Sequence, residues 1–201
     1  MKNSKLRRIL LTLACAVLLV SLSVGATLAY LTSTTGVVTN TFTVGNVKIT
    51  LDETDVTVLG VKETDIRVTE NDYHLLPAHS YIKDPTVHID AESEDCWLFV
   101  KVTNDIAEIE DATTIADQMK ALGWTKVDGE TNVYAYKEIV SAGEDVVVFN
   151  SFKIKGTVTK EELAAYDEKT ITVQAYAVQA DGLASSADAW TAAPCTWGAA
   201  N

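Results

Sequence analysis

The three histidines are the residues most able to support metal or acid–base chemistry. His74 and His79 are five residues apart, on either side of Pro77, with no glutamate between them. A protease-type zinc helix requires two histidines four residues apart on one face and a glutamate beside the first. We therefore interpret His74 and His79 as surface residues of a turn. His88 alternates with apolar neighbours and is predicted to point to solvent, so no metal site is predicted.

Cys96 is the thiol best placed to act as a nucleophile, because it stands at the start of an apolar run. It directly follows Glu92-Ser93-Glu94-Asp95, and negative neighbours raise the pKa of a thiol and disfavour the reactive thiolate. A structural role is therefore favoured. In an oxidising compartment Cys96 could form a disulfide with Cys195, and the sequence leaves pairing open.

Three acidic clusters could suggest a carboxylate pair or a calcium site: Asp52-Glu53-x-Asp55, Glu92-x-Glu94-Asp95 and Glu108-x-Glu110-Asp111. None has the spacing or the glycine of a calcium loop, so we interpret them as solvated loop acids with at most loose calcium binding. The chain has no glycine-rich phosphate loop and no G-x-S-x-G motif. We expect neither an enzyme nor a cofactor.

The N-terminus has the pattern of a secretory signal. Four basic residues in the first eight precede an uncharged segment from Ile9 to Leu31 that includes ILLTLACAVLLV. The apolar density falls after Val20, and Thr27-Leu28-Ala29 places small residues where a signal peptidase reads. We predict cleavage between Ala29 and Tyr30; a retained membrane anchor is the alternative.

Charge limits the partners of the mature chain. Cleavage would remove four of the sixteen basic residues and none of the twenty-eight acidic ones, so the formal net charge becomes −16. Such a chain is repelled by nucleic acid and by anionic membrane surfaces. We expect neither as a partner, and contact with a membrane only before cleavage.

Alternation of apolar and polar residues predicts strands along most of the mature chain. It is clear in Val47–Leu51, and it changes parity at Gly45-Asn46, where a bulge or break is expected. The HSYIKD stretch between Pro77 and Pro85 is predicted to be a turn or an edge. Further strands are predicted at Val56–Val61, Asp65–Thr69, Thr86–Ile89, Trp97–Thr103, Val133–Tyr136, Val146–Ile154 and Thr170–Val178.

Two short helices are predicted between these strands. Thr114-x-x-Asp117 and Thr159-x-x-Glu162 are capping patterns, and Gly123 would end the first helix. Met119 and Trp124 are interpreted as core residues. The fold class is therefore mainly β: an antiparallel β-sandwich with two short inserted helices. The predicted organisation is a signal peptide (1–29), an N-terminal arm (30–45), the sandwich (46–190) and a loosely ordered tail (191–201).

Two stretches near the N-terminus are distinctive: GATLAYLTS at the end of the signal, and Asn40-Thr41-Phe42, Gly45 and Val47 of the strand that follows. Together they resemble the TasA/camelysin family of Gram-positive secreted proteins. LLPAHSYIKDPTVHI, SEDCWLFVKV and VQADGLASSADAW are similar to the clostridial branch of that family. The usual P-G before the K-D-P strand is Pro77-Ala78 here, so the turn is expected to differ in detail.

The resemblance implies a signal read by a dedicated, SipW-type signal peptidase, a jelly-roll sandwich and a role at the cell surface or in the extracellular matrix of a biofilm. It also implies fibres in which the freed N-terminal segment adds as a strand to the next subunit. Phe42, Val44, Val47 and Ile49 would be the inserted side chains. If residues 46–52 belong to the chain's own sandwich instead, residues 30–44 would donate and Gly45 would be the hinge.

Two other functions stay open at this stage. Camelysin-like members are described as surface metalloendopeptidases, but the sequence shows no zinc motif. A monomeric adhesion or carbohydrate-binding sandwich is permitted by Trp124, Trp190 and Trp197, although packing explains Trp124 and Trp190 more simply. The leading expectation is a secreted homopolymer that contacts matrix or cell-surface components.

Overall fold

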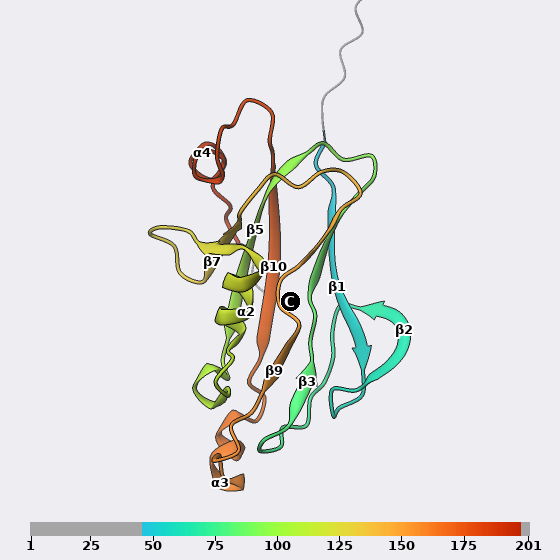
Figure 1. Cartoon of the computed structure of the whole chain (residues 1–201), viewed down its shortest axis with the longest axis vertical. Coiled ribbons are helices and arrows are strands. Elements are labelled where there is room, and N and C mark those ends of the chain that lie inside the picture. The colour runs from blue at the N-terminus through green and yellow to red at the C-terminus, as the bar shows by residue number, and fades with distance from the viewer. Residues whose placement is uncertain (1–45, 198–201) are drawn as a thin grey trace, which may run out of the picture. The chain divides into compact units, whose positions relative to one another are not determined.

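A computed structural model of the chain describes residues 46–197 (Figure 1). These residues belong to the unit Val44–Asn201, and the description below concerns that unit alone. The predicted cleavage site at Ala29 and Tyr30, and the predicted inserted residues Phe42 and Val44, lie outside the described residues. Within residues 46–197, no helix is long and apolar enough to cross a membrane.

Residues 46–197 form short strands with helical turns between them. The strands are β1 (Ile49–Val56), β2 (Lys62–Val68), β3 (Ser80–Ile82), β4 (Thr86–Ile89), β5 (Cys96–Asn104), β6 (Trp124–Lys126), β7 (Val133–Tyr136), β8 (Asp145–Val147), β9 (Ser151–Lys153) and β10 (Ile171–Gln179). The helices are α2 (Ile115–Leu122), α3 (Lys160–Leu163) and α4 (Ser186–Ala192), with 3-10 turns η1 (Ala107–Ile109) and η2 (Ala164–Tyr166).

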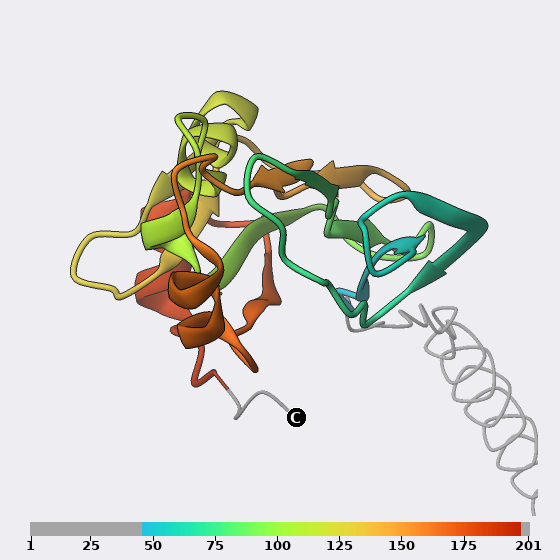
Figure 2. The same cartoon turned by 90° about the horizontal axis from the view of Figure 1, so that it is seen from below.

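The strands form two four-stranded antiparallel sheets and one small pair. The first sheet has the order β2-β1-β4-β8, the second has the order β10-β5-β7-β6, and β3 pairs with β9. The helices lie on the side of the second sheet, away from β2 (Figures 1 and 2). The predicted fold class, a mainly β antiparallel sandwich with short helices, is confirmed.

The main core lies between the sheets. Val87 and Ile89 of β4 face Leu98 and Val100 of β5 in one continuous apolar cluster. Burial of each such side chain stabilises the folded state by roughly 1.5–3 kcal/mol relative to leaving it exposed to water. Met119 of α2 and Trp124, the first residue of β6, also belong to this cluster, as the sequence predicted. They are 1% and 2% exposed, respectively.

Two predicted strands are wrong. The strand expected at Val56–Val61 is the end of β1 followed by a tight turn, because Gly60 takes a φ of +69° against the backbone of Tyr81. The long strand expected at Val146–Ile154 is two strands, β8 and β9, which lie in different sheets. At the crossover Gln118 of α2 accepts hydrogen bonds from the backbone N–H groups of Asn150 and Ser151.

The helices follow their capping signals. Both predicted capping boxes are present, at Thr114–Asp117 and Thr159–Glu162, and α2 ends at Gly123 with a φ of +100°. A third helix, α4, was not predicted; the Ser185 side chain caps it by accepting from the N–H of Asp188. Because α4 extends past residue 190, part of the predicted loose tail is helical.

Candidate functional site

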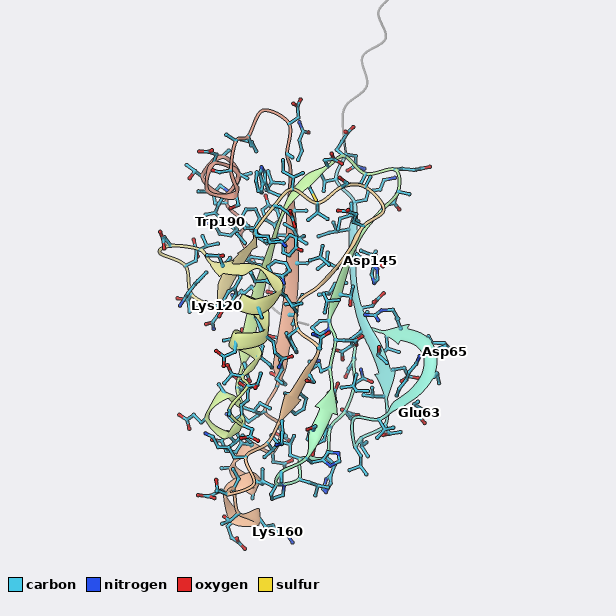
Figure 3. The ribbon with its side chains drawn as sticks, in the orientation of Figure 1. Glu63, Asp65, Lys120, Asp145, Lys160 and Trp190 are labelled. Carbon is cyan, nitrogen blue, oxygen red and sulfur yellow. The ribbon has the colours of Figure 1, made fainter. Side chains whose placement is uncertain are left out.

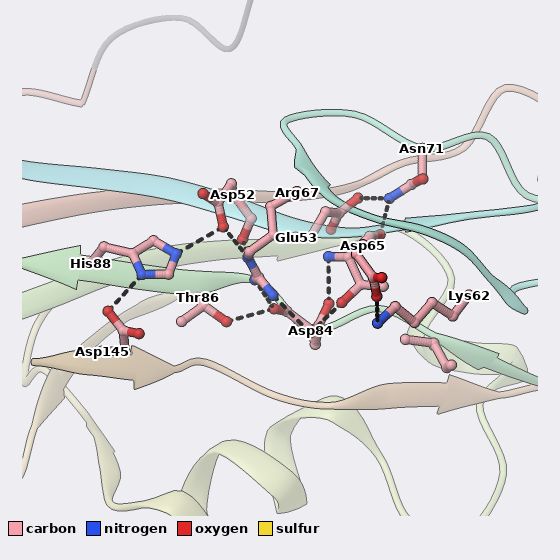
Figure 4. Close-up of polar contacts among 12 residues, drawn as sticks. Asp52, Glu53, Lys62, Asp65, Arg67, Asn71, Asp84, Thr86, His88 and Asp145 are labelled. Atoms are coloured by element: carbon pink, nitrogen blue, oxygen red, sulfur yellow. Dashed lines mark hydrogen bonds and ion pairs between the residues drawn. The ribbon is translucent and has the colours of Figure 1, made fainter.

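A network of polar side chains covers the outer face of the first sheet (Figure 4). Alternation along the strands places Asp52, His88 and Asp145 there, because their neighbours Leu51, Val87 and Val146 point into the core. We call the network of Asp52, Arg67, Asp84, His88 and Asp145 the sheet clasp.

His88 is the centre of the sheet clasp. Its Nδ1 lies 2.6 Å from Oδ1 of Asp145 on β8, and its Nε2 lies 2.8 Å from Oδ1 of Asp52 on β1. Both ring nitrogens can donate only in the imidazolium form. Burial acts against the charged form, but the hydrogen bonds to Asp52 and Asp145 outweigh it and raise the pKa of His88. His88 therefore lies on the outer face, as the alternation predicted, but two carboxylates hold its ring, so that its side chain is only 26% exposed.

Arg67 joins β2 to the same network. Its Nε donates to the Asp52 carboxylate, and its Nη1 lies 3.3 Å from Oδ2 of Asp84. The Asp84 carboxylate also accepts from the N–H and hydroxyl of Thr54 at 2.7 Å and 2.8 Å. Burial acts to raise the pKa of Asp52, but the hydrogen bonds from Arg67 and His88 hold that pKa below its usual value.

A second polar group lies buried beside the clasp, and we call it the Glu53 cluster. Glu53 accepts from Nζ of Lys83 at 2.6 Å and from Nδ2 of Asn71 at 2.8 Å. Glu53 and Lys83 are 5% and 9% exposed. The Lys83 ammonium lies 5.6 Å from the centre of the Tyr73 ring, and burial, with nearby Glu53 and Asp84, raises the pKa of Tyr73.

The acidic clusters separate in the structure. The prediction of solvated loop acids is wrong for Asp52, Glu53 and Asp55, which lie inside β1 with side chains bonded to different partners. It is also wrong for Glu110, which is buried and accepts from the N–H of Ile115; burial raises its pKa. Glu94 and Asp95 line a surface pocket with Asp181.

The other candidate residues have structural surroundings. His79 contacts the carbonyl oxygen of Leu59, and the carbonyl of His74 accepts from the Tyr81 hydroxyl. No group of three or more His, Cys, Asp or Glu side chains within residues 46–197 is arranged to hold a metal ion.

Cys96 is fully buried, and burial, with Asp95 nearby, raises the pKa of its thiol to about 11. Cys195 and Cys96 are both free thiols, so the considered disulfide between them is not formed in the structure.

Aromatic side chains gather on the outer face of the second sheet. Trp190 of α4, which is labelled in Figure 3, stacks on Trp197 at 6.2 Å between ring centres and packs against Phe99 at 5.1 Å. This packing orders part of the predicted tail. Trp124 lies in the main core instead, where its indole N–H donates to the carbonyl of Val147, so Trp124 is not available as a surface platform.

Within the part of the chain that the structure describes, β10 pairs with β5 alone, so its other edge is free. Backbone bonds from Asp105 to Thr170 and from Ala180 to Asp95 flank the β10–β5 ladder. Bonding alternates in an antiparallel ladder, so the even-numbered residues of β10 bond to β5. The odd-numbered residues direct N–H and C=O outward and have no backbone partner within residues 46–197: Ile171, Val173, Ala175 and Ala177.

The side chains of these odd-numbered residues point inward but are only partly buried. The same is true of the start of the first sheet, where Ile49 opens β1 and pairs with Ile89. Among residues 46–197, the sandwich core is thus incompletely covered along one side, where β1 and β10 approach each other, and we call this side the open flank. It comprises Val47, Ile49, Leu51, Ile171, Val173, Ala175 and Ala177.

Of the four predicted inserted residues, Val47 and Ile49 thus pack on the chain's own core. The sheet clasp and the Glu53 cluster were missed by sequence reasoning. The only sequence signal for these contacts was the alternation in residues 52–54 (DET) and 86–90 (TVHID), which places Asp52 and His88 on the polar faces of their strands. Comparisons with protein-family models, with curated proteins and with solved structures found no match for this chain.

Proposed function

We propose that this chain is a secreted structural subunit of an extracellular matrix, and that it assembles with copies of itself. In this proposal residues 30–44 of one copy, freed by cleavage after Ala29, add as a strand to β10 of the next copy. The support from the sequence is the resemblance of the N-terminal region to the TasA/camelysin family. The support from the structure is the open flank, described above.

The open flank is the observation that carries the proposal. A nine-residue edge strand with outward N–H and C=O groups is a template for another strand. An added strand would satisfy those groups and cover the half-buried Ile171 and Val173 with its own apolar side chains. Phe42 and Val44 share one parity, so both would point to the same face of such a strand.

The two long edges of the sandwich differ in a way that favours β10. β2, at the edge of the first sheet, carries Lys62, Glu63, Asp65 and Arg67 in seven residues. Figure 3 shows Glu63 and Asp65 at this outer edge. Charged side chains on an edge strand discourage pairing with another chain. β10 has no charged residue, so it lacks this protection.

Deletion of the arm tests the proposal. The mature chain beginning at Tyr30 should form fibres visible by electron microscopy and elute early in size exclusion, whereas a chain beginning at Gly45 should remain monomeric. A synthetic peptide of residues 30–44 added to the shortened chain should bind it and protect β10 amides from hydrogen exchange. Equal assembly by the two chains would rule out donation from this arm, and absence of assembly by both would rule out the matrix role.

A further inference from the structure

The Glu53 cluster brings together an amine, a primary amide and a carboxylate from three segments of the chain. Glu53 belongs to β1, Asn71 to the segment after β2, and Lys83 to the segment between β3 and β4. One carboxylate oxygen, Oε2, lies 2.6 Å from Nζ of Lys83, and the other, Oε1, lies 2.8 Å from Nδ2 of Asn71. A single carboxylate therefore contacts both a nucleophile and a potential leaving group.

Two members of this group, Lys83 and Glu53, are largely shielded from water, and Asn71 is partly buried beside them. The side chains of Lys83 and Glu53 are 10% and 6% exposed, and the Tyr73 ring lies beside the ammonium. A buried lysine is rare unless it is paired, and a buried pair loses much of its favourable solvation. Transfer of a proton from Lys83 to Glu53 would convert two buried charges into two neutral groups and leave a nucleophilic amine.

The Asn71 amide is held and polarised by the backbone of β1. Its Oδ1 accepts from the N–H of Val56 at 3.0 Å, and its Nδ2 donates to the carbonyl of Thr54 at 2.9 Å. A backbone N–H directed at an amide oxygen stabilises the negative charge that develops there when a nucleophile attacks the carbon. The Val56 N–H is placed to act as such a donor.

We propose that Lys83 and Asn71 become joined by an intramolecular amide bond, with Glu53 as the proton carrier. Glu53 takes a proton from the Lys83 ammonium, and the neutral Nζ attacks Cγ of Asn71. The bond between Cγ and Nδ2 breaks, Glu53 and the attacking nitrogen supply the protons that Nδ2 needs, and nitrogen leaves as ammonia. Lysine ammonium and asparagine amide thus give one secondary amide and one ammonium ion, with no oxidant or cofactor.

Glu53 holds Nζ of Lys83 on one carboxylate oxygen and the amide of Asn71 on the other, and such proximity favours a step that the same groups do not undergo in water. Well-oriented intramolecular reactants reach effective concentrations of about 10⁵–10⁸ M. The product would close a ring from residue 71 to residue 83 and tie the segment after β2 to the strand pair β3–β9. Such a bond would strengthen an extracellular subunit without a disulfide, and it does not depend on the assembly proposed above.

Mass spectrometry of the purified secreted chain tests the bond. The intact mass should be lower than the sequence mass by one ammonia molecule. Trypsin should fail to cleave after Lys83, so Val68–Lys101 should remain one peptide whose fragmentation spectrum has no breaks between residues 71 and 83. A full sequence mass, or normal cleavage after Lys83, would overturn the proposal. A mass deficit with normal cleavage would assign the ammonia loss to another site.

Glu53→Gln tests the role of Glu53 in proton transfer, because it keeps the two reacting residues, Lys83 and Asn71, and a side chain of similar shape but removes the proton carrier. This variant should have the full sequence mass and be cleaved after Lys83. Lys83→Arg, which keeps a positive charge but lacks the amine, should also retain the full mass. The wild-type measurement decides the proposal by itself, so the test does not depend on the variants folding. A mass deficit in Glu53→Gln would remove Glu53 from the mechanism.

Discussion

His88 lies directly opposite Asp145 across the β4–β8 pair, with Nδ1 2.6 Å from Oδ1. The other ring nitrogen contacts Asp52 on β1, so one imidazole links three strands of the first sheet. Asp52 in turn contacts Arg67 on β2. The sheet clasp therefore spans all four strands of this sheet, and its strength depends on the charge of His88.

The first prediction is that the clasp stabilises the fold mainly in mildly acidic solution. The pKa of His88 is raised above 6.5, so its contribution is complete below about pH 6.5 and is lost as pH rises through the folded pKa. The pKa of Asp52 lies below 3.8, so its contribution is lost only as pH falls through that lower value. His88→Gln should cost about 1 kcal/mol near pH 5 and less at pH 9.

Urea unfolding of wild type and His88→Gln at several pH values measures this difference. Other titrating groups are shared by both proteins, so the difference isolates His88 and its partners. Asp145→Asn should weaken the effect, because it removes one of the two carboxylates. A difference in unfolding free energy that stays constant from pH 5 to pH 9 would contradict an ionising His88.

The second prediction concerns the hydroxyl of the buried Tyr81, which both donates and accepts a hydrogen bond. It donates to the carbonyl of His74 and accepts from the N–H of Leu76, both at 2.7 Å. Tyr81→Phe should lower the free energy of unfolding by about 1–3 kcal/mol, since two backbone groups lose their partner. Tyr73→Phe is a control, because the Tyr73 hydroxyl bonds to the carbonyl of Ile82 at a more exposed position and should cost less. Equal losses of unfolding free energy in Tyr81→Phe and Tyr73→Phe would show that the two hydrogen bonds of the Tyr81 hydroxyl stabilise the fold no more than the single bond of Tyr73.

The third prediction concerns the turn after β1. A Cβ atom at Gly60 would lie 2.6 Å from Cα of Tyr81, and the carbonyl of Gly60 accepts from the N–H of Ile82, so the backbone cannot easily shift. Gly60→Ala should therefore cost well above the roughly 1–2 kcal/mol expected from positive φ alone. Gly129→Ala is the matched control, because Gly129 has a φ of +80° and no atoms nearby. Thermal unfolding of both variants checks the difference, and similar losses would contradict the close packing.

The sequence predicted the fold class better than the strand boundaries. The sequence identified β4, β5, β7 and β10 as strands. Alternation of buried and more exposed residues marks a strand such as β7, and a nearly continuous apolar run marks the buried strand β5. The run from Val146 to Ile154 contains only Asn150 and Ser151 as turn-favouring residues. At the break between the sheets, the backbone N–H groups of both residues donate to Gln118 from a distant helix. Helix α4 was missed although Ser185 accepts from the N–H of Asp188; the shorter α3 was predicted because Thr159 and Glu162 form a full capping box.

The polar sites could not be predicted in the same way. His88 is 36 residues from Asp52 and 57 residues from Asp145, so their contacts depend on strand order and register. A single sequence shows which side chains share a face of one strand but not which strands are neighbours. The same reason hides the meeting of Glu53 and Lys83, 30 residues apart.

The fourth prediction tests the free edge of β10 without removing the arm. The N–H of Val173 points away from β5, so Val173→Pro removes an edge donor and leaves the β5 ladder intact. The proline ring would also obstruct an incoming strand. The mature variant should therefore fold, with a far-ultraviolet spectrum like that of wild type, and should fail to form fibres.

Val173→Thr is the control for this variant, because it keeps the N–H and nearly the same shape at a partly exposed position. It should assemble like wild type. The pair separates loss of edge bonding from loss of apolar contact: if backbone pairing drives assembly, only the proline variant fails. Fibres formed by Val173→Pro at the wild-type rate would exclude the β10 edge as the acceptor and leave the charged β2 edge as the remaining long candidate.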